Sequence, residues 1–208
     1  MILYKFKPLT DFEFVADIII NNRLFTTKYT SLNDPMEGFF FDYREGKYKD
    51  TGIAEARKKH LVCSLSATLS DPLLWAHYAD GFKGVCIEVE INESLIKPHK
   101  IDYSKDALVI SYDRSDKLMG EPRPDVNEMA IQTLTRKFPD WAYEQEYRLL
   151  NHSDNPFLED GVQVLSVTFG VNTSPIYKEI IKSILPSGVF CFESALNTWS
   201  KVVRMPNS

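Results

Sequence analysis

The sequence predicts an α+β fold with a mixed sheet and flanking helices, in one domain that spans residues 1–208. Segments with the two-residue period of a strand alternate with segments that carry helix caps. The chain also has no internal repeat, linker or low-complexity tract. Its 208 residues are 44% hydrophobic and 25% charged, which is ordinary for a globular domain with a buried core.

The predicted elements follow from local patterns. Apolar alternation and β-branched residues predict strands at 2–6, 24–27, 61–66, 85–90, 101–103, 108–112, 141–150, 162–169, 188–192 and 201–205. Helices are predicted from residue 10 to 22, 53–60, 73–79, 125–138 and 174–185. Thr10 with Glu13 has the spacing of a capping box, and either Ser70 or Asp71 caps the third helix.

The most informative stretch is Trp141–Leu150, read as a strand. A period of two puts Glu144, Glu146 and Arg148 on one face and the aromatic residues on the other. Two carboxylates on neighbouring pleats raise each other's pKa unless a cation intervenes. Such a pair can bind a ribose, orient a nucleophile or act as a base. The alternative is a charged strand face with a local ion pair, because structural ion pairs also perturb pKa values.

The net charge and the hydropathy of the chain argue against nucleic acid and membranes as partners. The net charge of −5 and the pI of about 5.4 disfavour nucleic acid as a partner, because the summed field repels phosphate. The first residues lead directly into a strand, and no apolar run approaches the length of a membrane span. We therefore expect a cytoplasmic protein that does not contact a membrane.

Cysteines and histidines predict no metal site. The three cysteines lie in apolar strand-like runs without Cys-x-x-Cys spacing, as expected of buried thiols in a reducing compartment. The histidines at 60, 99 and 152 are scattered, and His77 has no neighbouring ligand set. A nucleophile pair of Cys63 and His77 stays open as an alternative.

Several other polar or aromatic residues are candidates for a cleft, each with a structural alternative. Ser64 and Ser66 share a strand face, where serines also satisfy local hydrogen bonds. The turn of Asn33, Asp34 and Pro35 is either self-bonded or the rim of a pocket. The short helix carries Trp75, His77 and Tyr78; Trp75 and Tyr78 are three residues apart, which suits either core packing or ring stacking.

Three blocks together resemble one known family. They are Leu32–Glu37, then Leu74–Glu88 with its Trp-x-His-Tyr-x-x-Gly-x-x-Gly pattern, then Trp141–Arg148. Their order and content resemble the bacterial domain-of-unknown-function family 2971 (DUF2971), from Leu3 to about Phe169. The family implies no reaction, and the resemblance suggests a link to prokaryotic defence and toxin-like genes.

A weaker resemblance is to the ADP-ribosyltransferase fold. There a Ser-x-Ser strand and a later Glu-x-Glu strand surround NAD, and Ser64-Leu65-Ser66 and Glu144-Gln145-Glu146 match them in order. The first strand departs from the pattern, because it has Tyr4 and Lys5 where those enzymes have Arg or His. This departure puts NAD binding in doubt.

The weaker resemblance implies a role for each matching residue. Glu146 would be the catalytic carboxylate that stabilises the oxocarbenium charge, and Glu144 would orient the acceptor. The serines would hold the strand and a ribose hydroxyl, Arg148 or Lys5 would neutralise phosphate, and Tyr78 or Trp75 would stack on a ring. The expected cleft comprises Tyr4, Lys5, Asn33, Asp34, Ser64, Ser66, Trp75, His77, Tyr78, Glu144, Glu146 and Arg148.

Three hypotheses follow for function. The first is an NAD-dependent or nucleotide-directed enzyme of the ADP-ribosyltransferase type. The second is a non-catalytic module of a phage-defence or toxin–antitoxin system that binds a nucleotide or a protein partner in the same cleft. In the third, the blocks are only the structural core of the family.

Overall fold

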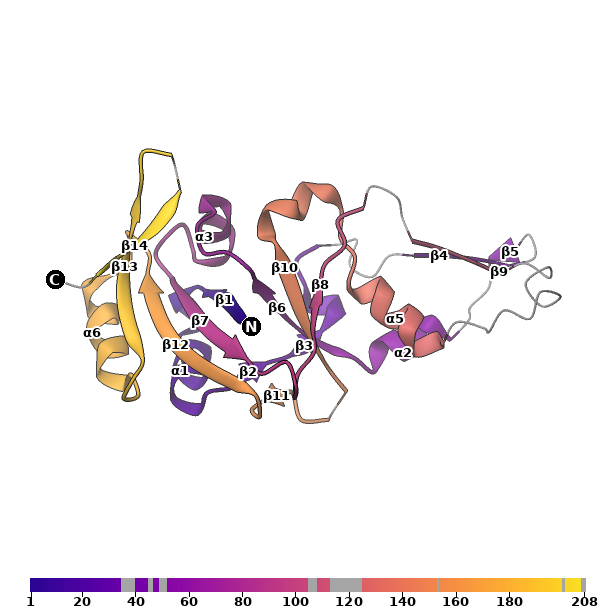
Figure 1. The fold of residues 1–208 in the computed structure, drawn as a ribbon, viewed down its shortest axis with the longest axis horizontal. Coiled ribbons are helices and arrows are strands. Elements are labelled where there is room, and N and C mark those ends of the chain that lie inside the picture. Colours follow the sequence, from indigo (N-terminus) through magenta and orange to yellow (C-terminus); the bar gives the residue numbers. More distant parts are fainter. Residues whose placement is uncertain are drawn as a thin grey trace.

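The computed structural model describes residues 1–34, 40–44, 47–48, 52–104, 108–112, 125–152, 154–199 and 201–206. A mixed sheet with the order β14-β13-β12-β7-β1-β6-β10-β8, and β3 beside β6, forms its centre (Figure 1). Its strands are β1 (Ile2–Lys7), β3 (Thr27–Lys28), β6 (Leu61–Ser66), β7 (Val85–Ile91), β8 (Pro98–Lys100), β10 (Glu146–Asn151), β12 (Val162–Phe169), β13 (Phe190–Leu196) and β14 (Val202–Pro206). The pair β12 and β13 is parallel, and the other described pairs of this sheet are antiparallel.

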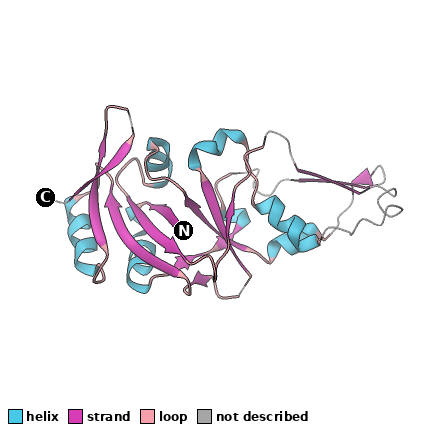
Figure 2. Cartoon of the chain, viewed as in Figure 1, coloured by secondary structure: helices cyan, strands magenta, loops and turns pink. Residues whose placement is uncertain are grey.

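Helices cover both faces of the sheet (Figure 2). On one face, α1 (Phe12–Asn21) and α6 (Pro175–Ile184) pack on apolar side chains of the central strands. On the other face, α3 (Pro72–Tyr78) contributes Leu74 and Trp75 to a smaller core with Phe6 and Cys86. The predicted α+β class, a mixed sheet flanked by helices, is confirmed, and the single domain over residues 1–208 stays a prediction.

Smaller elements lie outside this sheet. Strands β2 (Leu24–Phe25) and β11 (Phe157–Leu158) form one pair, and β4 (Phe40–Arg44), β5 (Lys47–Tyr48) and β9 (Leu108–Tyr112) form a three-stranded sheet. Helices α2 (Ile53–Lys58) and α5 (Val126–Leu134) pack against each other through Ile53 and Met129. Among the described helices, none has the length and apolar character that a membrane span requires.

Two predicted helix ends are wrong. Thr10 lies in a 3₁₀ turn, Leu9–Asp11, so α1 starts later and has no side-chain cap, which removes the predicted capping box. The helix predicted through Phe138 ends at Leu134, because the next residues bond to the segment around Asp102 instead. The amide of Asp102 donates to the carbonyl of Thr135 at 2.9 Å, and the amide of Lys137 donates to the carbonyl of Asp102 at 3.0 Å.

The sheet is weakly joined between β1 and β6. Strand β1 pairs with β7 from Ile2 to Lys7, but among the described residues it pairs with β6 only through Tyr4 and Ser66. The other end of the same β6 edge, at Leu61 and Val62, pairs with β3. The middle of β6 therefore has no strand partner on this side, and Lys5 Nζ donates to the free carbonyl of Ser64 at 2.8 Å.

Candidate functional site

The predicted strand Trp141–Leu150 is wrong in its first half. Pro139–Glu144 forms a 3₁₀ helix, Gln145 adopts a left-handed conformation with φ of 45°, and β10 begins only at Glu146. Proline at the start of the turn and the left-handed residue at its end explain why the period of two does not apply. Glu144 thus approaches Glu146 from a turn and not from a neighbouring pleat.

Ser66 holds this turn in place. Its hydroxyl donates to the carbonyl of Glu144 at 2.6 Å, and the amide of Ala67 donates to the carbonyl of Gln145 at 3.0 Å. These contacts agree with the predicted role of the serines in holding the strand, and the role on a ribose hydroxyl stays a prediction. Ser66 therefore positions residues 139–145, which we name the glutamate turn.

Two buried carboxylates share one lysine at this turn. Lys137 Nζ donates to Oε2 of Glu144 at 2.7 Å and to Oε2 of Glu146 at 3.4 Å. On the far side of Glu146, Arg148 Nε donates to Oε1 at 2.8 Å. The exposed fractions of these four side chains are only 1% to 5%. We name Lys137, Glu144, Glu146 and Arg148 the carboxylate cluster.

The surroundings push the pKa values of the two carboxyls in opposite directions. Burial alone would raise the pKa of Glu146, but Arg148, Lys137 and the Ser64 hydroxyl outweigh it, so its pKa is lowered. Burial raises the pKa of Glu144, and Lys137 only partly offsets this. The lowered pKa keeps Glu146 ionised, whereas the raised pKa makes Glu144 the carboxyl of the pair that takes up a proton first as the pH falls.

A cavity of about 250 Å³ opens next to this cluster, where β6 lacks a strand partner. Tyr78 of α3 donates its hydroxyl to Oε1 of Glu144, and Asn33 Nδ2 donates to the Tyr78 oxygen at 2.9 Å. Burial and the bond to Glu144 raise the pKa of Tyr78, so its hydroxyl stays protonated. The cavity is lined by Tyr4, Lys5, Phe6, Ser31, Leu32, Asn33, Ser64, Leu65, Ser66, Leu74, Tyr78, Lys137, Glu144 and Glu146.

Most of the residues proposed from sequence line this cavity, but Trp75 and Arg148 do not. Trp75 is fully buried, its Nε1 donates to the carbonyl of Leu69 at 2.7 Å, and its ring packs edge-on against Phe6. Trp75 is therefore core and not a stacking platform. Arg148 is also fully buried and donates to the carbonyl of Leu134 at 2.6 Å, so it supports Glu146 from behind.

His77 and Asp34 do not line the cavity, whereas Asn33 does. His77 is exposed on α3 and lines a neighbouring hollow instead of the cavity. Asp34 is buried and is not among the lining residues, whereas Asn33 is at the rim. The rest of this predicted turn, Pro35–Glu37, lies outside the described residues.

Sequence reasoning missed Lys137 and Tyr103. Lys137 also stacks over Trp141, with Nζ 4.5 Å from the ring centroid, and the Tyr103 hydroxyl accepts the amide of Glu146 at 2.7 Å. No motif marks either residue. The one available signal was charge, because two buried carboxylates need more than one cation.

The structure excludes the suggested Cys63–His77 pair and shows where two of the other histidines lie. Cys63 is buried in the core under α1 and α6, whereas His77 is on α3 at the other face, so the suggested nucleophile pair is wrong. His60 and His152, distant in sequence, have ring centroids 3.8 Å apart, and burial and His152 lower the pKa of His60. Within the ranges that the structure describes, no group of three or more His, Cys, Asp or Glu residues could hold a metal ion.

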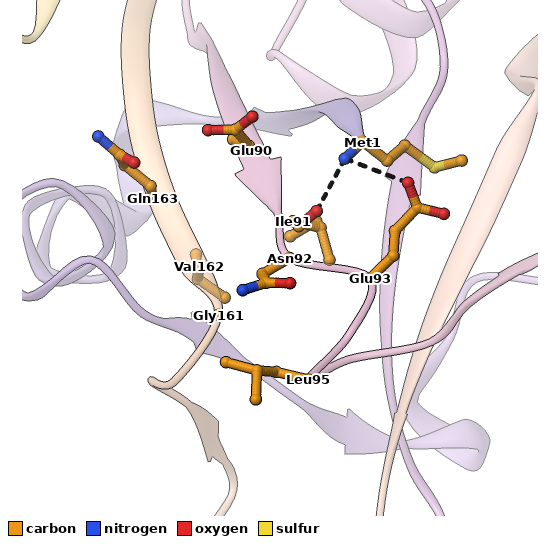
Figure 3. A pocket seen from close by; sticks show the side chains of 9 residues that line it. All are labelled: Met1, Glu90, Ile91, Asn92, Glu93, Leu95, Gly161, Val162 and Gln163. Carbon is orange, nitrogen blue, oxygen red and sulfur yellow. Dashed lines mark hydrogen bonds and ion pairs between the residues drawn. The ribbon is translucent and has the colours of Figure 1, made fainter.

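A larger hollow of about 530 Å³ lies across the end of β7 and the start of β12 (Figure 3). The Met1 ammonium group donates to the carbonyl of Ile91 at 2.8 Å and pairs with Glu93 at 3.4 Å. The polar side chains that line this hollow, including Glu90 and Gln163, are exposed. Because it lacks converging buried polar groups, we take the smaller cavity as the candidate site.

Comparison with known proteins gives one match. No curated protein and no solved structure matches the chain significantly. The matching family model covers Tyr78 and the whole carboxylate cluster but not the Leu32–Glu37 block, so the match is narrower than the extent predicted from sequence. Residues 74–149 match the family model described as "Protein of unknown function (DUF2971)", the same family that the sequence blocks resemble.

Proposed function

We propose that the cavity binds the ribose part of a nucleotide, with NAD as the first candidate, and that the carboxylate cluster catalyses transfer at that ribose. The observation that carries the proposal is the sharing of Lys137 by two buried carboxyls with opposite pKa shifts. In a pair of this kind, one carboxyl supplies a fixed negative charge and the other carries a proton.

The size of the cavity supports a sugar-sized ligand. A volume of about 250 Å³ lies below the range of pockets that hold drug-sized molecules. One ribose with its ring substituent suits this space, and the remainder of a dinucleotide would extend outside it. Tyr4, Asn33 and Ser64 offer hydroxyl or amide groups at the wall for sugar hydroxyls.

The proposed step is substitution at the ribose carbon that bears nicotinamide. The carbon–nitrogen bond breaks and nicotinamide leaves with its electron pair, so positive charge develops on the ribose. Glu146, held ionised by Arg148 and Lys137, stabilises that charge. A nucleophile with an O–H or N–H group, which is water when only NAD is supplied, forms the new bond to the same carbon and gives its proton to Glu144.

A non-catalytic binding module is the second candidate. It is favoured by the paired state of the cluster, because two cations that neutralise two carboxylates are also typical of structural ion-pair networks. In this case the cavity would bind a nucleotide or a protein segment without turnover, as a sensor in a phage-defence or toxin–antitoxin system would.

The test is to incubate the protein with NAD and to measure nicotinamide release by chromatography and NAD binding by calorimetry. We expect Glu144→Gln to abolish release while NAD still binds and the melting temperature changes by only a few degrees. Glu90→Gln is the matched control, because Glu90 lies at the other hollow (Figure 3).

The outcomes separate the two candidates. Saturable binding without release, weakened by Glu144→Gln, would favour the binding module. Absence of NAD binding to a folded wild-type protein, or equal effects of Glu144→Gln and Glu90→Gln, would refute the proposed site for NAD.

A further inference from the structure

A second hollow adjoins the candidate site at the end of β1. It has a volume of about 430 Å³ and shares Lys5, Phe6 and Tyr78 with the cavity. Its other walls come from the end of β1 and the residues after it, and from the end of α3 and the turn after it, namely Lys7, Pro8, Thr10, His77 and Asp80. We name this hollow the lysine groove.

Two lysines, Lys5 and Lys7, line the lysine groove together with one carboxylate, Asp80. Lys5 and Lys7 are two positions apart on β1, so both side chains leave the strand on the same side. Lys5 Nζ donates to the Ser64 carbonyl at 2.8 Å, and Lys7 Nζ lies 5.2 Å from the centroid of the Phe14 ring. Neither forms an ion pair with a described residue.

The nearest carboxylates do not remove this excess charge. Asp80 at the groove pairs with Lys83 at 3.8 Å, and Asp11 acts on Lys7 only as a neighbouring charge. Burial lowers the pKa of Lys7, and the charge of Lys5 lowers it further, against the opposing effect of Asp11. Two ammonium groups that repel each other in a half-buried place are stabilised by an anion.

We propose that the lysine groove binds the phosphate groups of the nucleotide whose ribose occupies the cavity. Lys5 lines both spaces, so a ligand can pass continuously from the carboxylate cluster to the groove. A pyrophosphate group carries enough charge to contact both lysines, and the Thr10 hydroxyl and the His77 ring offer further donors. The link to a ribose rests on the proposed function, whereas the anion site itself does not.

The first experiment uses inorganic pyrophosphate as the probe. Calorimetric titration of wild-type protein should show saturable binding that weakens as NaCl is increased. Lys7→Gln should weaken it by about tenfold or more, the loss typical of one charged hydrogen bond. Lys59→Gln removes an exposed charge at the end of α2 and should leave the affinity unchanged.

A second variant distinguishes loss of the binding site from misfolding of the protein. His77→Ala alters an exposed side chain of the same groove and should weaken pyrophosphate binding by a smaller factor than Lys7→Gln. No binding of pyrophosphate to the wild type would overturn the proposal, as would equal affinities of the Lys7, His77 and Lys59 variants. Melting temperatures confirm that each variant is folded.

The same series separates this inference from the proposed function. If pyrophosphate binds as described but NAD neither binds nor reacts, the phosphate site stands and the NAD proposal fails. If Lys7→Gln leaves both pyrophosphate and NAD binding intact, the phosphate site fails while the ribose site stands. Glu144→Gln should abolish nicotinamide release without weakening pyrophosphate binding.

Discussion

Two glutamate-centred clusters lie on the α3 face of the sheet and differ in their access to solvent. Glu88 of β7 accepts hydrogen bonds from Ser166 at 2.6 Å, Arg204 at 2.9 Å and Tyr4 at 3.3 Å. The Glu88 and Arg204 side chains are 15% and 22% exposed, whereas those of Glu146 and Arg148 are 5% and 1% exposed. Water therefore shares more of the charge in the first cluster, whereas protein groups hold most of it in the second.

This difference in exposure distinguishes a cluster that only supports the fold from one that can also serve a function. The Glu88 cluster joins β1, β7, β12 and β14, and Tyr4 is the one of its residues that lines the cavity beside Glu144. The carboxylate cluster buries more charge and places three of its four members, Lys137, Glu144 and Glu146, at a cavity wall. Burying ions is unfavourable unless they are paired well, so a cluster placed at a cavity in this way indicates a use for its charge.

The largest expected effect is that of Arg148→Met. It leaves Glu146 buried with the longer contact to Lys137 and the Ser64 hydroxyl, and loss of one partner of a buried pair costs about 3 to 5 kcal/mol. Urea denaturation at pH 7 measures the free energy of unfolding. A cost below about 1 kcal/mol would show that solvent reaches Glu146 and would remove the contrast between the clusters.

A change of intermediate size in the free energy of unfolding is expected when the pH is lowered. Because the folded pKa of Glu146 is lowered, its contribution is complete above the ordinary carboxyl value of about 4.3 and is lost as pH falls from there toward the folded pKa. The raised pKa of Glu144 acts in the opposite direction, since the folded state then holds its proton more tightly. Unfolding free energies from pH 6 to pH 3 should therefore fall less steeply in Glu146→Gln, by on the order of 1 to 2 kcal/mol.

Glu144→Gln is the control for that measurement. Because it removes the opposing contribution, its unfolding free energy should fall more steeply with acid than that of the wild type. Parallel curves for the wild type and both variants would mean that neither carboxyl titrates differently in the folded protein.

The smallest effect is expected from Arg204→Met. Glu88 keeps its bonds to Ser166 and Tyr4 and stays in contact with water, so the cost should be about 1 kcal/mol. The same urea experiment compares it directly with Arg148→Met. A cost equal to that of the buried arginine would show that exposure does not distinguish the two clusters.

Local patterns predicted most of the sheet strands, but the strand predicted at 101–103 is wrong, because the structure has β8 at Pro98–Lys100 instead, and the site was predicted only in part. Strands such as 61–66 and 162–169 have a clear apolar period, and Asp71 caps α3 as one of the two predicted options. Ser64, Glu144 and Glu146 were named from motif order, and they line one cavity. The strand geometry assumed for Glu144 was wrong, because a proline turn and a left-handed glutamine override the pattern.

What the sequence could not supply is long-range pairing. Lys137 reaches the glutamates only because the segment after α5 pairs with Asp102 and turns back, and no local signal encodes that contact. Trp75 illustrates the converse, since its spacing from Tyr78 fits both core and cavity. The edge contact with Phe6 and the bond to Leu69 place it in the core.

The single pairing of Tyr4 with Ser66 has a consequence for the cooperativity of the fold. Strands β7, β12, β13 and β14 are connected to β1 by long ladders, and β8 and β10 are connected to β6 in the same way. Amide hydrogen exchange should therefore divide the sheet into two cooperative units that meet at this pair. A ligand held by β1 on one side and by β6 and the glutamate turn on the other would join the units and slow exchange in both.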